Sequence, residues 1–251
     1  MLEDKVVIVT GGSRGLGQAY AIEAAHLGAK VVAGDILDCG DTIRQIEANG
    51  GTAIGVKIDV TDMDTVNAMA ESAVDAFGGI NVLINNAALY GGLTGGRFDM
   101  LDEDEWDRTM SVNVKGIWKC CKAVVPHLRT AGGGSIVNVA SLAATYGLPF
   151  ALHYTTSKAA VIGMTRALAR ELGRSEIRVN AIAPTAVLTE GTAEFFGDKT
   201  DSAMEVIKND QSLKRNPVPA DMVGTVMWLA SDASGFVTGQ TIAIDGGTVM
   251  S

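Results

Sequence analysis

The chain has 251 residues, of which 47% are hydrophobic and 20% charged, so it can bury a large core and is not expected to be disordered. Its net charge of −9 argues against nucleic-acid binding, because an acidic surface repels phosphates. The three cysteines form no CxxC pair, which favours a reducing, cytoplasmic location, and no apolar run approaches the roughly 18 residues of a membrane span.

Short apolar segments rich in Val and Ile alternate with longer amphipathic segments along the chain. Segments that are apolar throughout are typical of strands buried on both faces, as in a parallel sheet covered by helices. The spacing leaves room for a crossover helix between strands, which predicts an α/β fold with a doubly wound, seven-stranded parallel sheet. The predicted strands are Val6–Val9, Val31–Ala33, Ala53–Ile58, Val82–Ile84, Ile136–Val139, Val179–Ile182 and Thr241–Ile244.

Four segments have the apolar periodicity of helices and end close to a glycine or proline, residues that stop helices. No internal repeat or Pro/Ser-rich linker interrupts the pattern, so a single domain is expected to cover residues 1–251. The predicted helices are Gly15–Leu27, Thr61–Phe77, Asp104–Leu128 and Ser157–Leu172.

Residues 189–219 break the alternation, because they are polar and contain only a weak amphipathic segment near Ala203–Ile207. A connection of this length in a compact domain is usually a lid or a binding loop. We therefore expect a substrate loop at about 189–219, with an ordinary surface excursion as the alternative.

The segment TGGSRGLG, residues 10–17, follows the first predicted strand and precedes the first helix. Glycines permit a tight bend and let backbone N–H groups approach a phosphate, while the helix N-terminus faces the pyrophosphate with its positive dipole end. The spacing is GxxxGxG rather than the usual GxGxxG. In the context of the alternating strands and helices, it favours a Rossmann-type dinucleotide site.

Asp35 stands at the end of the second strand, 18 residues after Gly17. A carboxylate at this place accepts hydrogen bonds from both ribose hydroxyls of the adenosine and repels a 2′-phosphate, which favours NAD over NADP. Arg14 favours the opposite choice, because its guanidinium can reach a 2′-phosphate. We give Asp35 the greater weight, since the ribose must lie at that strand end.

The ends of the next two strands point at the same crevice. Asp59 and Val60 follow the third strand, where they can hold the adenine edge. Asn86 and Ala87 follow the fourth, where small residues let a nucleotide lie against the backbone.

Tyr154 and Lys158 are four residues apart, so on a helix their side chains share one face. A free tyrosine has a pKa of about 10, and a neighbouring ammonium favours the phenolate and lowers that pKa toward the range useful for proton transfer. Ser141 follows the fifth strand, where its hydroxyl can hydrogen-bond a substrate oxygen beside the phenol. A lone YxxxK pattern is usually a surface helix, so its context decides the interpretation.

Taken together, TGGSRGLG, NNAA at residues 85–88, Ser141 thirteen residues before YTTSK, and VTGQTIAIDGG at residues 237–247 resemble the short-chain dehydrogenase/reductase family. The resemblance runs from about residue 4 to the C-terminus. It departs from the family pattern at Ala88, where relatives usually have glycine, and at Thr185, where Pro184 is usually followed by glycine.

The resemblance implies a general acid/base role for Tyr154, and for Lys158 a contact to the nicotinamide ribose together with the lowering of the tyrosine pKa. It implies that Ser141 orients the substrate oxygen and that Asn113 anchors a water-mediated proton relay. It also implies that Val187 and Thr189 contact the carboxamide, and that the chain forms a homotetramer. The expected NAD contacts are Gly11, Ser13, Arg14, Gly15, Leu16, Gly17, Asp35, Ile36, Asp59, Val60, Asn86, Ala87, Tyr154, Lys158, Pro184, Val187 and Thr189.

The expected substrate is a secondary alcohol or a ketone, because the residues expected around it are largely apolar. His153 is more often a structural histidine at such a place than a substrate contact, and the three histidines have no ligand-like spacing, so no catalytic metal is expected. The candidate lining is Leu89, Tyr90, Leu142, Tyr146, Leu148, Phe150, His153, Leu188, Phe195 and Phe196.

Two alternatives stay open. One is a 3-oxoacyl-thioester reductase that uses NADPH, against which Asp35 argues. The other is a non-enzymatic relative that binds nucleotide, against which the complete set of Asn113, Ser141, Tyr154 and Lys158 argues.

Overall fold

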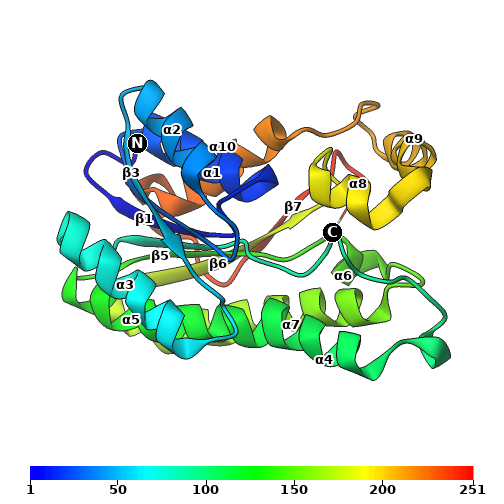
Figure 1. Ribbon diagram of the computed structural model, residues 1–251, viewed down its shortest axis with the longest axis horizontal. Coiled ribbons are helices and arrows are strands. Elements are labelled where there is room, and N and C mark those ends of the chain that lie inside the picture. The colour runs from blue at the N-terminus through cyan, green and yellow to red at the C-terminus, as the bar shows by residue number, and fades with distance from the viewer. Residues whose placement is uncertain (251) are drawn as a thin grey trace.

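Seven parallel strands form the centre of the molecule in the computed structural model, which describes residues 1–250 (Figure 1). Their order across the sheet is β3-β2-β1-β4-β5-β6-β7. The predicted doubly wound parallel sheet is therefore confirmed, and each predicted strand overlaps an observed one, although Ile58 lies just beyond β3. The strands are β1 Val6–Thr10, β2 Lys30–Asp35, β3 Thr52–Lys57, β4 Val82–Asn85, β5 Gly134–Val139, β6 Ile177–Pro184 and β7 Thr241–Ile244.

Helices cover both faces of the sheet, and a separate buried apolar cluster lies under each layer (Figure 1). One layer is α1 Gly15–His26, α2 Gly40–Ala48 and α10 Pro219–Ala230, and the other is α3 Met63–Phe77, α4 Glu103–Met110, α5 Ile117–Thr130 and α7 Leu152–Leu172. Among residues 1–250, no helix combines the length and the apolar character needed to cross a membrane.

Several helices differ from the sequence prediction. The helix α7 begins at Leu152, before the predicted Ser157, so Tyr154 lies in its first turn. The long helix expected over residues 104–128 is divided by a π-helical turn at Ser111–Gly116. The stretch 189–219 is partly helical rather than a loop, because α8 (Glu190–Phe196) and α9 (Thr200–Asp210) form within it.

The strand order places the carboxyl ends of the central strands around one opening. The chain passes from β1 outward to β2 and β3, then returns to β4 on the other side of β1. The connections that leave β1 and β4 therefore run in opposite directions. In Figure 1, α8 and α9 lie beyond this edge of the sheet, near the C-terminus.

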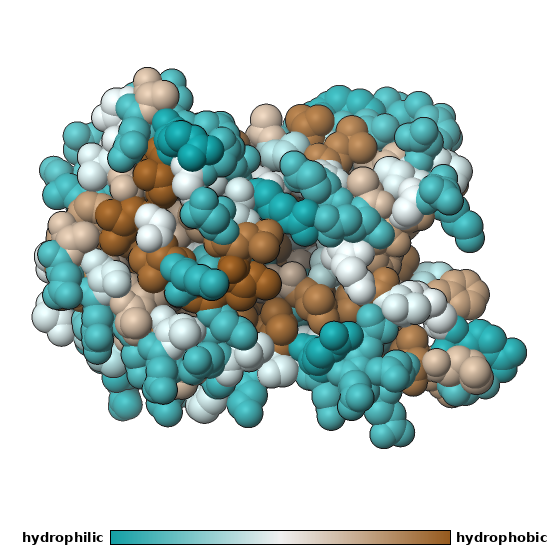
Figure 2. All heavy atoms as spheres, viewed as in Figure 1, coloured by the Kyte–Doolittle hydropathy of each residue, from teal (hydrophilic) through white to brown (hydrophobic). Residues whose placement is uncertain are grey.

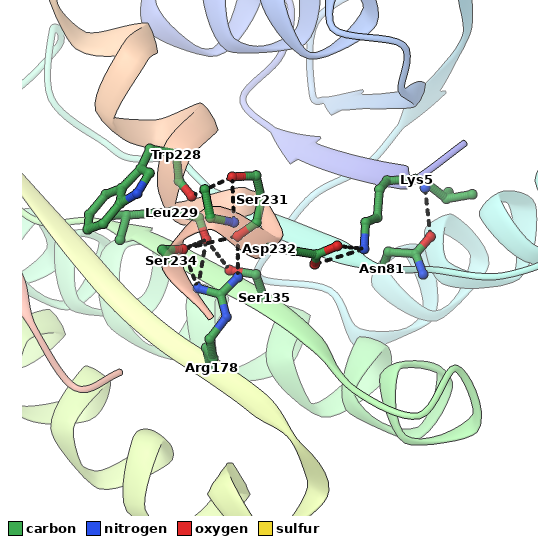
Figure 3. A network of polar contacts seen from close by, with 11 residues as sticks. Lys5, Asn81, Ser135, Arg178, Trp228, Leu229, Ser231, Asp232 and Ser234 are labelled. Atoms are coloured by element: carbon green, nitrogen blue, oxygen red, sulfur yellow. Dashed lines mark hydrogen bonds and ion pairs between the residues drawn. The ribbon is translucent and has the colours of Figure 1, made fainter. Parts of the chain in front are cut away.

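The opposite edge of the sheet, where the amino ends of β5 and β6 lie, contains a network of polar side chains (Figure 3). We call it the amino edge. The Arg178 guanidinium donates to the carbonyl oxygens of Leu229 and Ser231 at 2.9 Å and to the Ser234 hydroxyl at 2.7 Å. The hydroxyl of Ser135 donates to the same Leu229 oxygen at 2.7 Å. These acceptors stand at the C-terminal end of α10 and after it, where helix carbonyls lack partners within the helix. Arg178 therefore holds the end of α10 against the sheet.

Candidate active site

The carboxyl ends of the central strands open into a cavity of about 1110 Å³. Its walls come from the glycine turn after β1, from the segments that follow β2 to β6, and from α8 and α9. Figure 2 shows hydrophobic residues gathered across the middle of the molecule in this view, between mostly hydrophilic helix surfaces. Ligands of doubly wound sheets bind at this edge, so the cavity is the candidate active site.

The glycine turn has a backbone that other residues would disrupt. Gly11 and Gly15 have φ angles of +67° and +57°. A Cβ atom on Gly17 would lie 1.9 Å from the Gly11 carbonyl oxygen. The N-cap residue of α1, Arg14, makes no side-chain cap, so the first N–H groups of the helix stay available beside the cavity. An uncapped helix N-terminus that follows a glycine turn suits a pyrophosphate.

Asp35 at the end of β2 lies beside this turn, as expected. Its Oδ2 accepts hydrogen bonds from the Ser13 backbone N–H at 3.0 Å and from the Ser13 hydroxyl at 2.7 Å, and its Oδ1 accepts from the Leu37 N–H at 3.1 Å. The carboxylate is therefore fixed at the cavity wall and attached to the turn. Its place next to the glycine turn fits a partner for ribose hydroxyls.

The glycine turn is also tied to β4. The Asn86 side-chain amide donates to the carbonyl oxygens of Thr10 and Gly11, both at 3.1 Å. Gly17 differs from its prediction as a cofactor contact, because its Cα is buried against the Gly11 carbonyl and does not line the cavity. The predicted contacts that do line it are Gly11, Ser13, Arg14, Gly15, Leu16, Asp35, Ile36, Asp59, Val60, Asn86, Ala87, Tyr154, Lys158, Pro184, Val187 and Thr189.

Tyr154, Lys158 and Ser141 meet on one wall of the cavity. The Lys158 Nζ lies 5.8 Å from the centre of the Tyr154 ring and donates to the Val139 carbonyl oxygen at 2.8 Å. Ser141 stands just beyond the end of β5, and its hydroxyl accepts from the Ala143 N–H at 3.2 Å. The first turns of α7 and the end of β5 thus bring together the three residues that the sequence singled out.

The acidity of Tyr154 differs from the expectation. Burial raises the pKa of the phenol, Tyr90 adds to this effect, and the Ser141 hydroxyl opposes it. Burial also lowers the pKa of the Lys158 ammonium to about 8. The predicted lowering of the tyrosine pKa by lysine is therefore wrong for this structure. The physical reason is that the phenol is desolvated, which favours its neutral form.

Asn113 lies in the π-helical turn and is fully buried. Its Oδ1 accepts from the Leu89 N–H at 2.7 Å, and its Nδ2 donates to the Leu89 carbonyl and the Ser157 hydroxyl, both at 3.1 Å. The side chain does not line the cavity. It joins the segment after β4 to α7 next to Lys158, and single-turn π-bulges of this kind are frequent at functional sites.

The substrate half of the cavity is largely apolar, as predicted, but four of the ten candidates lie elsewhere. Phe150 and Leu188 are exposed, and His153 is buried with its Nε2 3.7 Å from Glu105 Oε2. Phe195 lies behind Tyr90, with the two rings stacked at 4.7 Å. The candidates that line the cavity are Leu89, Tyr90, Leu142, Tyr146, Leu148 and Phe196.

Sequence reasoning missed the contribution of α9. Ala203, Val206 and Ile207 line the cavity. The weak amphipathic pattern of the segment near Ala203–Ile207 is the feature of the sequence that could have indicated this helix. Asp210 adds a carboxylate to the lining at the end of this helix. Within residues 1–250, no group of three or more His, Cys, Asp or Glu side chains is placed to hold a metal ion.

Known proteins resemble the chain over its whole length. A family model described as enoyl-(acyl carrier protein) reductase matches residues 11–249. An uncharacterized oxidoreductase of Mycobacterium tuberculosis is 43% identical, with 100% of this chain and 99% of that protein covered. A 3-oxoacyl-[acyl-carrier-protein] reductase of Thermotoga maritima is 38% identical, with 99% of each chain covered.

Solved structures agree with the fold and differ in their nucleotide. Carveol dehydrogenase from Mycobacterium avium in complex with NAD has a TM-score of 0.92 at 28% identity, with 98% of each chain covered. A putative NAD(P)-dependent gluconate 5-dehydrogenase from Beutenbergia cavernae with bound NADP has a TM-score of 0.90 at 33% identity, with 98% of this chain and 97% of that chain covered.

Proposed function

Since this chain belongs to the short-chain dehydrogenase/reductase family of oxidoreductases, we propose that it interconverts a secondary alcohol and a ketone with NAD(H). The observation that carries the proposal is the meeting of Tyr154, Lys158 and Ser141 on the wall of one cavity, next to the glycine turn and Asp35. The proposal covers the reaction type, the cofactor and the chemical class of the substrate.

The residues of the cleft fit a dinucleotide. The uncapped N-terminus of α1 would hold the pyrophosphate, and the Asp35 carboxylate would accept hydrogen bonds from the adenosine ribose. Lys158 would contact the nicotinamide ribose, and Val187 and Thr189 the carboxamide. When bound, the nicotinamide supplies the hydride acceptor for alcohol oxidation or the hydride donor for ketone reduction.

Tyr154 handles the proton of the reaction. A tyrosine with an ordinary or raised pKa is protonated at neutral pH, so the phenol can donate a proton to a ketone oxygen as that oxygen becomes an alkoxide. In the oxidation direction the phenol must first lose its proton, so we expect oxidation to accelerate as the pH rises. Ser141 orients the substrate oxygen beside the phenol, and Lys158 places a positive charge next to its ring.

The apolar walls favour a neutral substrate. Leu142, Leu148 and Phe196 line the substrate half of the cavity, as does the apolar face of α9. The nearest charged group on α9 is the Asp210 carboxylate, which would repel an acidic substrate. We therefore propose that residues 189–219 form the substrate-binding segment, although much of it is helical.

A second candidate is a 3-oxoacyl-thioester reductase that uses NADPH. The relative from Thermotoga maritima and the presence of Arg14 in the glycine turn favour it. Asp35 opposes it, because a carboxylate at the ribose position repels a 2′-phosphate.

We propose a cytoplasmic homotetramer that binds neither nucleic acid nor membranes. The tetramer is implied by the resemblance to the family, and the net charge of −9 opposes contact with phosphate-rich surfaces. Light scattering coupled to size-exclusion chromatography would test the number of subunits, and a mass other than four chains would contradict the tetramer.

The experiment that tests the function is Tyr154→Phe, assayed with a panel of aliphatic, cyclic and aromatic secondary alcohols and NAD. Removing the proton-transfer group should lower turnover by about 10³-fold. Binding of NADH, measured by calorimetry, should stay within a factor of two or so, because the hydroxyl adds little to dinucleotide affinity. Turnover at the wild-type rate would contradict the proposed mechanism, and failure of the wild-type chain to bind NADH would contradict the function.

A further inference from the structure

Arg14 of the glycine turn forms an ion pair with Glu194 of α8, a residue 180 positions away in the sequence. Arg14 Nη1 donates to Glu194 Oε1 at 2.5 Å, and Nη2 donates to Oε2 at 3.0 Å. Each guanidinium nitrogen thus faces its own carboxylate oxygen, which is the strong bidentate geometry of arginine–carboxylate pairs. The pair connects the nucleotide side of the cavity to the substrate side.

The surroundings keep Glu194 in this position. The next residue, Phe195, stacks on Tyr90 with a ring separation of 4.7 Å and an interplanar angle of 19°. Gly91 leaves space for the carboxylate, because a Cβ atom at residue 91 would lie 2.3 Å from Glu194 Oε2. The segment after β4 therefore both supports α8 and makes room for its acidic side chain.

Arg14 also has other acidic neighbours. The hydrogen bond to Glu194 is the largest cause that raises the pKa of its guanidinium, and the charges of Glu190 and Asp35 act in the same direction. Three carboxylates therefore surround one cation. A guanidinium in this setting has little free capacity to attract a further anion.

We propose that Glu194 is a cofactor-specificity residue, which holds the Arg14 guanidinium away from the 2′-phosphate of NADP(H). The inference rests on the proposed NAD(H)-linked function and adds a second determinant to Asp35. Asp35 repels the phosphate directly, whereas Glu194 occupies the cation that would otherwise bind it. The presence of an arginine in the glycine turn is thereby compatible with a preference for NAD.

The test is calorimetric binding of NADPH and NADH to the full-length chain and to Glu194→Gln. Releasing Arg14 should tighten NADPH binding by about fivefold, a modest change because both side chains are half exposed and screened by solvent. NADH binding should change by less than about twofold, since NADH has no 2′-phosphate. The gain should shrink at high salt, as expected of a charge–phosphate contact.

Two further variants separate the ion pair from a general charge effect. Glu190→Gln removes the same charge from the same helix without breaking a hydrogen bond to Arg14. Its affinity for NADPH should therefore increase by less than about twofold. In Arg14→Met/Glu194→Gln the gain should disappear. The inference would be overturned if Glu190→Gln increased NADPH affinity as much as Glu194→Gln does. It would also be overturned if the increase persisted in Arg14→Met/Glu194→Gln.

The outcome for the wild-type chain distinguishes the two proposals. If it binds NADH more tightly than NADPH and Glu194→Gln leaves NADPH binding unchanged, this inference fails and the proposed function stands. If the wild-type chain prefers NADPH, the proposed cofactor and this inference both fail, because Arg14 would then be free to bind the phosphate.

Discussion

A half-buried arginine and a buried lysine stand at opposite ends of the same pair of strands, and their hydrogen-bond partners differ. At the amino edge, Arg178 donates to two carbonyl oxygens and a hydroxyl (Figure 3). At the carboxyl edge, Lys158 donates to a single protein acceptor, the carbonyl oxygen of Val139. Burial lowers the pKa of both side chains.

The difference in hydrogen-bond partners indicates that the two edges of the sheet have different roles. The Arg178 guanidinium uses three of its five N–H donors on acceptors of the protein itself, and these contacts stabilise the fold. An ammonium with one protein acceptor keeps donors that face the cavity, at a cost in desolvation. The amino edge therefore serves the stability of the fold, whereas the carboxyl edge keeps polar groups for chemistry.

In the comparison of the two edges, the largest expected effect comes from exchanging serine for alanine at the two ends of β5. Ser141→Ala should lower kcat/KM by about 100-fold, because the variant loses a hydrogen bond to the substrate oxygen in the transition state. Its melting temperature should change little, since the Ser141 hydroxyl accepts one hydrogen bond from the Ala143 N–H.

Ser135→Ala is the matched control at the amino end of the same strand. Its buried hydroxyl donates to the Leu229 carbonyl, so its loss should lower the free energy of unfolding by about 1 kcal/mol and leave kcat/KM unchanged. Equal effects of the two variants on activity would contradict the division between the edges.

Arg178→Met tests the amino edge more strongly. The change leaves the carbonyls at the end of α10 without their cation, which also interacts favourably with the C-terminal end of the helix dipole. The free energy of unfolding should fall by about 2 to 3 kcal/mol, measured by urea denaturation. The kcat/KM of the folded protein should not change. A large loss of kcat/KM, measured under conditions where all molecules are folded, would show that this edge affects catalysis.

The position of the site could be predicted from the sequence better than its electrostatics could. The four-residue spacing of Tyr154 and Lys158 places both on one face of α7, because that relation depends only on the helical repeat. The pKa of Tyr154 depends on burial and on Tyr90, which arrives from the segment after β4. No local pattern contains that contact, so the predicted direction was wrong.

The same contrast applies to the fold. The strands were predictable because segments buried on both faces are apolar throughout, as in β1. The helix α2 was missed because it is short and mostly polar, and its nine residues bury only Thr42 and Ile46. The ion pair of Arg14 and Glu194 was invisible for a different reason, since it joins residues that only the folded chain brings together.

The pH dependence of stability tests the state of Lys158. Folding lowers its pKa from 10.5 to about 8, so between these values the unfolded chain binds more protons than the native one. The free energy of unfolding attributable to Lys158 should therefore rise with pH, by about 1 kcal/mol between pH 8 and pH 9. Buried thiols such as Cys121, whose pKa is raised to about 12, act in the opposite direction above pH 9.

The Lys158 contribution is isolated by comparing urea denaturation of the wild-type chain and of Lys158→Met at both pH values. The difference in the free energy of unfolding between the two chains should change by about 1 kcal/mol from pH 8 to pH 9, because the two chains share every other titrating group. A difference that does not depend on pH would mean that the ammonium of the folded chain is as well solvated as that of the unfolded one.

Lys5→Met should have the smallest effect, although Lys5 belongs to the same amino edge as Arg178 (Figure 3). Its Nζ lies 3.0 Å from Asp232 Oδ1, but the aspartate side chain is 85% exposed, so water replaces the lost contact. The free energy of unfolding should change by less than about 0.5 kcal/mol, and any change should vanish in high salt. A loss of free energy of unfolding as large as that of Arg178→Met would mean that this edge is stabilised by charge rather than by hydrogen bonds to buried carbonyl oxygens.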